Sequence, residues 1–228
     1  MFSKIIHSDI RDIPMISVMV SLALVALFVM LEPSISRAVG SQFTVSTSVT
    51  AEISFATAAS NITMASLPGV TGGTTTGATQ VIVTTNNAAG YNMTMISSSS
   101  PALQGDTQGD SIPDYTPASA GVPDYNFVVA ANRAEFGYTI EASTTSDLDP
   151  SFLDNGSSCG VGAADAADRC WINASSTAAE TLINTTGPTA ASGSTSTIKF
   201  QLVINPNPSP AITQDSYTAT NTLTAIVN

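Results

Sequence analysis

The sequence has few charged residues, and very few of them are basic. Only 10% of its 228 residues are charged, against roughly a quarter in an average soluble domain. Six basic residues face 17 acidic ones, which gives a formal net charge of −11. Because proteins that follow a phosphate backbone need a basic surface, we expect no nucleic-acid partner.

Histidine is nearly absent. The single one, His7, lies ahead of an apolar run that we expect to be removed, so the exported chain would have no imidazole for base catalysis or zinc binding. Residues 156–160 match Gly-x-Ser-x-Gly, but that hydrolase elbow also needs a strand-to-helix turn and a downstream histidine. Acid pairs such as Asp147 with Asp149 suggest glycoside hydrolysis, but scattered loop acids form such pairs by chance. The sequence therefore favours a protein that is not an enzyme.

The N-terminal region has the layout of a secretory leader. Residues 15–31 are apolar, Lys4 and Arg11 precede them, and small residues follow. Signal peptidase needs small side chains at two positions, and Ala38-Val39-Gly40 offers them. We predict a signal peptide at residues 1–40 and a secreted or cell-surface protein.

Two alternatives stay open for this leader. Ser36-Arg37-Ala38 is a second candidate cleavage motif. The apolar run also reaches the lower length limit for spanning a bilayer, so an uncleaved anchor would export the rest of the chain as well. The membrane would then be contacted through this segment alone.

Cysteine is scarce too. Cys159 and Cys170 are the only two, and in an exported chain they are expected to form a disulfide. Closing so short a loop is worth roughly 2–3 kcal/mol in the chain-entropy model. We expect this bond to fix one loop without defining the fold.

Alternation of apolar and polar residues is the strongest pattern in residues 41–228. Its period of two is typical of strands with one buried face. From Phe43 to Phe55 the odd positions are mostly apolar and the even ones mostly Ser or Thr. About nine strands are predicted, at residues 43–55, 62–67, 80–85, 91–96, 125–131, 136–142, 170–173, 198–204 and 217–227.

These short strands predict one all-β domain over residues 41–228, an antiparallel, immunoglobulin-like β-sandwich. Thr is abundant and suits a half-exposed pleated surface. Residues 97–123 are polar and rich in Gly and Pro, which indicates a long surface loop. Residues 86–90 are predicted to close a hairpin, with Gly90 at positive φ. The prolines of residues 206–210 should keep the chain out of a sheet before the last strand.

One loop segment resembles a degenerate thrombospondin type 3 calcium repeat, which runs Asp-x-Asp-x-Asp-Gly-x-x-Asp. Asp106, Gln108, Asp110 and Asp114 would be its calcium ligands, since Ca²⁺ prefers several oxygens on a tight loop. Gln108 and Ser111 depart from the pattern. The alternative is an acidic, solvated loop without a cofactor.

Trp171, the only tryptophan, follows Cys170. It either packs inside the domain near the disulfide or offers an exposed ring on which a sugar could stack. We favour packing. A carbohydrate-binding adhesin module, with or without calcium, is therefore the alternative function, and glycans the alternative partner.

Several short motifs carry a family resemblance. Residues 84–91 (TTNNAAGY), residues 217–225 (YTATNTLTA) and the alternating first strand after the leader resemble exported bacterial surface proteins of the WxL-like and spore-coat-U-like kind. Uncharacterised exported proteins of candidate-phylum bacteria are similar in their Phe-Gly-Tyr and Cys-Trp steps, here residues 136–138 and 170–171. The resemblance implies an exported immunoglobulin-like sandwich that is assembled into surface structures or held on the wall. Ile172 and Asn173 follow Trp171, so the Trp-x-Leu signature itself is missing, and no functional residue is carried over.

Together these patterns predict a structural or adhesive component of the cell envelope or of a surface fibre. Its partners would be the envelope or neighbouring subunits. A fibre subunit has to expose a strand edge or a free strand for its neighbour, and residues 43–55 are the natural candidate because they exceed the usual strand length.

Overall fold

The computed structural model describes residues 12–30 and 40–228. Lys4, Arg11 and the predicted cleavage motifs, apart from Gly40, lie outside the described residues. The chain divides into two units, Met1–Ser48 and Val49–Asn228.

The first unit contains one helix, α1 (Asp12–Met30), which covers most of the apolar run. Its described apolar side chains are exposed all round, with Met19 at 72% and Leu22 at 70%. A helix without a polar face has no preferred side for packing on a soluble domain. Among the described residues, no helix has both the length and the apolar character that a membrane crossing requires.

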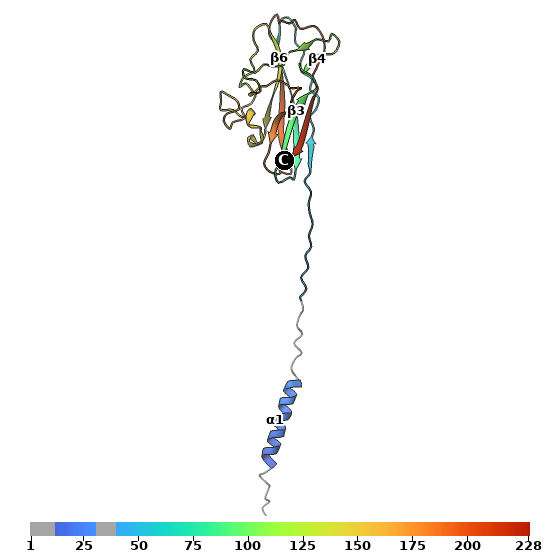
Figure 1. Cartoon of the computed structure of the whole chain (residues 1–228), viewed down its shortest axis with the longest axis vertical. Helices are drawn as coiled ribbons and strands as arrows, with labels where there is room; N and C mark the ends of the chain where they lie inside the picture. Colours follow the sequence, from blue (N-terminus) through green and yellow to red (C-terminus); the bar gives the residue numbers. More distant parts are fainter. Residues whose placement is uncertain (1–11, 31–39) are drawn as a thin grey trace, which may run out of the picture. The chain divides into compact units, whose positions relative to one another are not determined.

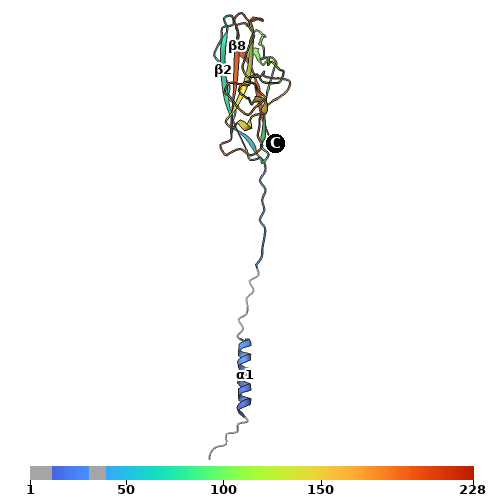
Figure 2. The same ribbon diagram turned by 90° about the vertical axis from the view of Figure 1, so that its left-hand side faces the viewer.

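The second unit is a β-sandwich (Figures 1 and 2), so the predicted all-β antiparallel architecture is confirmed. The main sheet has the order β1-β2-β8-β6, the second sheet has the order β10-β3-β7, and a small third sheet has the order β5-β4-β9. All paired strands are antiparallel. The strands are β1 (Ile53–Thr57), β2 (Gly73–Thr85), β3 (Tyr91–Ser97), β4 (Leu103–Gly105), β5 (Ser111–Ile112), β6 (Ala134–Ala142), β7 (Glu180–Asn184), β8 (Ser194–Ile204), β9 (Tyr217–Thr218) and β10 (Asn221–Val227).

The core lies between the two larger sheets. β3 and β8 alternate strictly between buried and half-buried residues, as a period of two requires when one face of each strand is covered. The buried set includes Val81, Val83, Tyr91, Met93, Tyr138, Ile140, Leu182 and Ile198. The half-buried face of β8 carries Thr195, Thr197 and Lys199, so polar residues cover the outside of the main sheet.

The turn at residues 86–90 forms, but it does not close a hairpin. Gly90 has φ +83° and its N–H donates to the Asn87 carbonyl oxygen at 3.0 Å, as the sequence predicts for the turn itself. The strands on either side, β2 and β3, lie in different sheets. A Cβ at residue 90 would collide with the backbone of Thr185, so this glycine allows the chain to pass close to the end of β7 as it enters β3.

Five predicted strands are wrong wholly or in part. Residues 217–227 form two strands, β9 and β10, which lie in different sheets. Only the last three residues of 43–55 enter β1, and 62–67 and 125–131 form no strand. Residues 170–173 make only isolated bridges. Residues 62–67 follow β2 instead, with Ile62 and Met64 packed over Gly77.

The alternation of apolar residues indicates that their side chains lie on one face of an extended segment. It does not indicate whether the backbone of that segment forms hydrogen bonds with a neighbouring strand.

The polar segment 97–123 has more order than a plain surface loop. It contains β4 and β5, which form the third sheet together with β9. The proline tract behaves as predicted, since residues 205–216 contain no strand.

Candidate functional site

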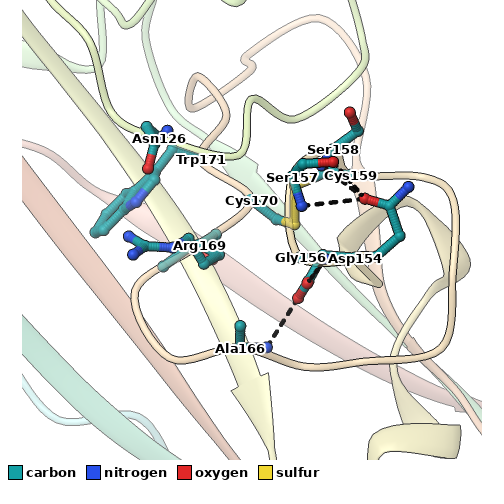
Figure 3. Close-up of a disulfide and its surroundings, with 12 residues drawn as sticks. Asn126, Asp154, Gly156, Ser157, Ser158, Cys159, Ala166, Arg169, Cys170 and Trp171 are labelled. Carbon is teal, nitrogen blue, oxygen red and sulfur yellow. Dashed lines mark hydrogen bonds between the residues drawn. A yellow bond between two sulfur atoms is a disulfide. The ribbon is translucent and has the colours of Figure 1, made fainter.

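The predicted disulfide is present (Figure 3). The Sγ atoms of Cys159 and Cys170 are 2.00 Å apart and their Cα atoms 5.6 Å apart, and both residues are buried. The bond joins the two ends of a loop that has almost no secondary structure. Its position therefore supports a structural role in this loop.

Asp154 organises the same loop from inside (Figure 3). Its side chain is 1% exposed, and its two carboxylate oxygens accept the N–H groups of Gly156 at 2.7 Å and Ala166 at 2.9 Å. Its own backbone exchanges two hydrogen bonds with Ala164. A buried carboxylate is stable when backbone donors satisfy it in this way. This role could not be predicted from the sequence, because an isolated aspartate in a loop has no distinctive spacing.

Trp171 is an interior residue. It is 2% exposed, its ring centroid lies 5.3 Å from that of Phe127 in an edge-on arrangement, and its Nε1–H donates to the Asp168 carbonyl oxygen at 3.0 Å. The Tyr115 ring also stacks on Phe127, with their centroids 4.4 Å apart. A sugar cannot stack on a covered ring, so Trp171 is no sugar platform in this conformation.

The four predicted calcium ligands have different neighbours. Asp106 and Gln108 are exposed. Asp110 accepts hydrogen bonds from the hydroxyls of Thr213 and Tyr217, which lower its pKa. Asp114 accepts the Ala102 N–H at 2.8 Å and the Ser100 hydroxyl at 3.2 Å, while burial raises its pKa.

The described residues contain no cluster of three or more His, Cys, Asp or Glu side chains that could hold a metal ion. The calcium site stays a prediction that this arrangement does not support.

Asp215 also contacts the predicted calcium loop, and its role was not predicted from the sequence. Its oxygens accept the N–H groups of Gln108 at 2.9 Å and Thr107 at 2.8 Å and the Thr107 hydroxyl at 2.7 Å. These donors lower the pKa of Asp215 to about 2. The carboxylate thus ties the start of the predicted calcium loop to the chain just before β9.

The outer face of the main sheet carries an ion-pair cluster. Lys199 Nζ lies 2.5 Å from Glu141 Oε1 and 3.0 Å from Asp168 Oδ1. Partial burial opposes the charge of Lys199, but the hydrogen bonds to Glu141 and Asp168 outweigh it and raise the lysine pKa. All three side chains are at least partly exposed, so the cluster is a modest surface stabiliser.

Residues 40–52 form no helix or strand, and all of them are exposed. Their apolar side chains are among the most exposed of the chain, with Phe43 at 85%, Val45 at 82% and Val49 at 84%. They alternate with Ser and Thr as in a strand whose one face is buried, yet none of them is buried. A row of exposed apolar side chains at strand spacing is typical of a segment that pairs with a partner.

The sandwich also has an incompletely covered side, along β1 and β10. These are edge strands of different sheets that lie in contact with each other (Figure 1). The inward residues Ile53 of β1 and Leu223 and Ala225 of β10 pack on the core but are only partly buried. We call this side, with its three partly buried residues Ile53, Leu223 and Ala225, the open seam.

No protein-family model and no curated protein sequence matches this chain. The residues and their geometry therefore carry the functional argument.

Proposed function

We propose that this chain is a non-enzymatic exported protein that serves as a structural or adhesive component of the cell envelope or of a surface fibre. The single observation that carries the proposal is the exposed, alternating segment at residues 40–52. Its apolar side chains would be poorly solvated in an isolated molecule, whereas strand addition between subunits would bury them.

The predicted leader agrees with this proposal. Cleavage near residue 40 would leave the alternating segment at the free N-terminus of the exported protein, where it could reach a neighbouring subunit. The oxidised pair Cys159–Cys170 fits an extracellular location, since disulfides persist outside the reducing cytosol. The immunoglobulin-like arrangement implied by the family resemblance belongs to the same proposal.

The site chemistry supports a non-enzymatic role. The described residues contain no histidine. Asp110, Asp154 and Asp215 each accept hydrogen bonds that hold loops in place. The alternative of a carbohydrate-binding module lacks the aromatic platform that Trp171 would have supplied, because that ring is buried.

Two measurements test the proposal. Antibodies against the sandwich should label the surface of intact producing cells, and the recovered native protein should be polymeric in electron micrographs. A variant lacking residues 42–51, which leaves β1 complete, should be exported and folded but no longer assemble. Abundant native protein in the cytosol with both thiols reduced, or normal filaments from the deletion variant, would contradict the proposal.

A further inference from the structure

We propose that residues 43–51 of one copy add as an extra strand to the free edge of β10 in a second copy, with their apolar side chains facing the open seam. This inference rests on the proposed assembly of subunits and names the surface that accepts the partner. The edge, the seam and the donor segment each support it independently.

The free edge of β10 can be read from its hydrogen bonds. At its two ends, the Ser98 N–H donates to the Thr220 carbonyl oxygen and the Asn228 N–H donates to the Gly90 carbonyl oxygen. The backbone N–H and C=O groups of the even-numbered residues of β10 therefore point toward β3, because the bonding direction alternates along an antiparallel strand. The N–H and C=O groups of the odd residues 221–227 point away from β3. Among the described residues, no other strand pairs with β10.

The inner face of β10 loses burial where a further strand would cover it. Leu223 lies opposite Met95 and Ala225 opposite Met93 in the register with β3. Met93 is 0% and Met95 3% exposed, whereas their partners on β10 are only partly buried. The inward side chains are therefore fully buried on β3 but only partly buried on β10, the next strand toward the edge.

The other wall of the seam is also unfinished. β1 ends at Thr57, after which the chain follows β2 without joining the sheet. Ile62 and Met64 of this stretch pack over Gly77 and remain partly buried. Ile212, in the proline-rich connection before β9, is another partly buried residue that packs on the core. The seam therefore presents apolar side chains from both layers of the sandwich.

The donor segment matches this surface in pattern, length and charge. Its odd positions carry Phe43, Val45, Val49 and Ala51, interrupted only by Thr47, and its nine residues can cover the seven of β10. Neither residues 43–51 nor β10 contains a charged side chain. Pairing would therefore bury no charge, despite the strongly negative net charge of each copy.

The segment of the same copy is poorly placed to fill the seam. The Glu52 N–H donates to Asn86 Oδ1 at 2.7 Å, and Asn86 Nδ2–H donates to the Thr50 carbonyl oxygen at 3.0 Å. These bonds continue the direction of β1 past the end of β2. To reach its own β10, the preceding chain would have to reverse within a few residues and break them. A second copy meets no such restriction.

Pairs of introduced cysteines in the full chain, produced with its leader, test the inference. The test compares even-numbered and odd-numbered donor positions, which lie on opposite faces of a strand. Thr224→Cys places a thiol on the outer face of β10, where the side chain is exposed. Thr44→Cys, Ser46→Cys or Ser48→Cys places its partner on the outer face of the donor. The matched control is Thr47→Cys, an equally exposed residue of the opposite parity. Laterally adjacent strands bring residues of one face within disulfide distance, while residues of opposite faces point apart.

A chain carrying Thr224→Cys and one even donor cysteine should form a ladder of covalent oligomers on a non-reducing gel. A chain carrying Thr224→Cys and Thr47→Cys should form no such ladder. Chains with only one introduced cysteine should form covalent dimers at most. Melting temperatures equal to that of the parent will establish that every variant is folded.

Three other results would overturn the inference. Filaments without a ladder from any even donor would reject the β10 edge but leave the proposed function intact. Thiols consumed within monomers would show that the segment folds back on its own chain. The absence of both filaments and a covalent ladder would reject both proposals.

Discussion

Tyr138 contains a buried hydroxyl without a hydrogen-bond partner, on the face of β6 that packs in the core. Burial raises its pKa, and the negative charge of Glu180 raises it further. Because an unsatisfied buried hydroxyl opposes folding, Tyr138→Phe should leave the melting temperature unchanged or raise it.

The matched control is Tyr115→Phe, since the Tyr115 hydroxyl donates to Asp124 Oδ2 at 2.7 Å. This change should lower the free energy of unfolding by about 1 kcal/mol. A larger loss at Tyr138 than at Tyr115, measured by thermal or urea unfolding, would show that the Tyr138 hydroxyl has a partner.

Glu180 should make stability depend on pH in a defined direction. Desolvation, and then the charge of Asp149, raises its pKa in the folded state. The folded protein therefore holds this proton more tightly than the unfolded chain, so ionisation at neutral pH is a penalty that disappears as pH falls through the raised pKa. Glu180→Gln should be more stable than the parent at pH 7 and lose that advantage in acid.

Asp215 provides the opposite sign for the same titration. Its pKa is lowered to about 2, so its stabilisation is present above the unfolded pKa near 4 and is lost as pH falls toward about 2. Asp215→Asn should therefore be less stable than the parent at pH 7, with the difference closing at low pH. Unfolding midpoints between pH 2 and 7 check both variants, and parallel pH curves for the two would contradict the assignment.

At the scale of elements, the disulfide loop should stabilise the fold without determining it. Cys159 and Cys170 are separated by 11 positions, so replacing both by serine should cost about 2–3 kcal/mol through the entropy of the unfolded chain. The sandwich should still form, since its two sheets pack against each other without the help of this bond and Asp154 continues to hold the loop. Denaturant unfolding with circular dichroism checks this, and loss of the β spectrum would contradict it.

Alternation predicted β3, β8 and β10 well, because each has one face on the core and a polar opposite face. The same reasoning failed at residues 43–52, where the pattern is as regular but every side chain is exposed. It also failed at residues 86–90, since a turn motif does not reveal whether the next strand joins the same sheet.

The candidate site was predicted less completely than the fold. The pairing of Cys159 with Cys170 was predicted from the cysteine count and from the expected export, and the structure confirmed the bond. The roles of Asp154 and Asp215 depend on backbone donors brought together by loops, which have no periodic signature. The open seam depends on Ile53 of β1 and on Leu223 and Ala225 of β10, which lie far apart in sequence and come together only after the two sheets have packed.

At the scale of the whole molecule, the sandwich should not need the alternating segment for its own stability. Residues 40–48 have exposed side chains, and Val49–Asn228 forms a separate compact unit. Chains of residues 41–228 and 49–228 should therefore melt at the same temperature when dilute and monomeric.

Assembly should separate these two chains as concentration rises. A contact made only between folded copies stabilises them by mass action, so the melting temperature of the 41–228 chain should increase with protein concentration. The 49–228 chain retains the open seam but lacks residues 43–48, and its melting temperature should stay constant. If both chains respond equally to concentration, the association uses another surface, because only the longer one has the complete donor strand.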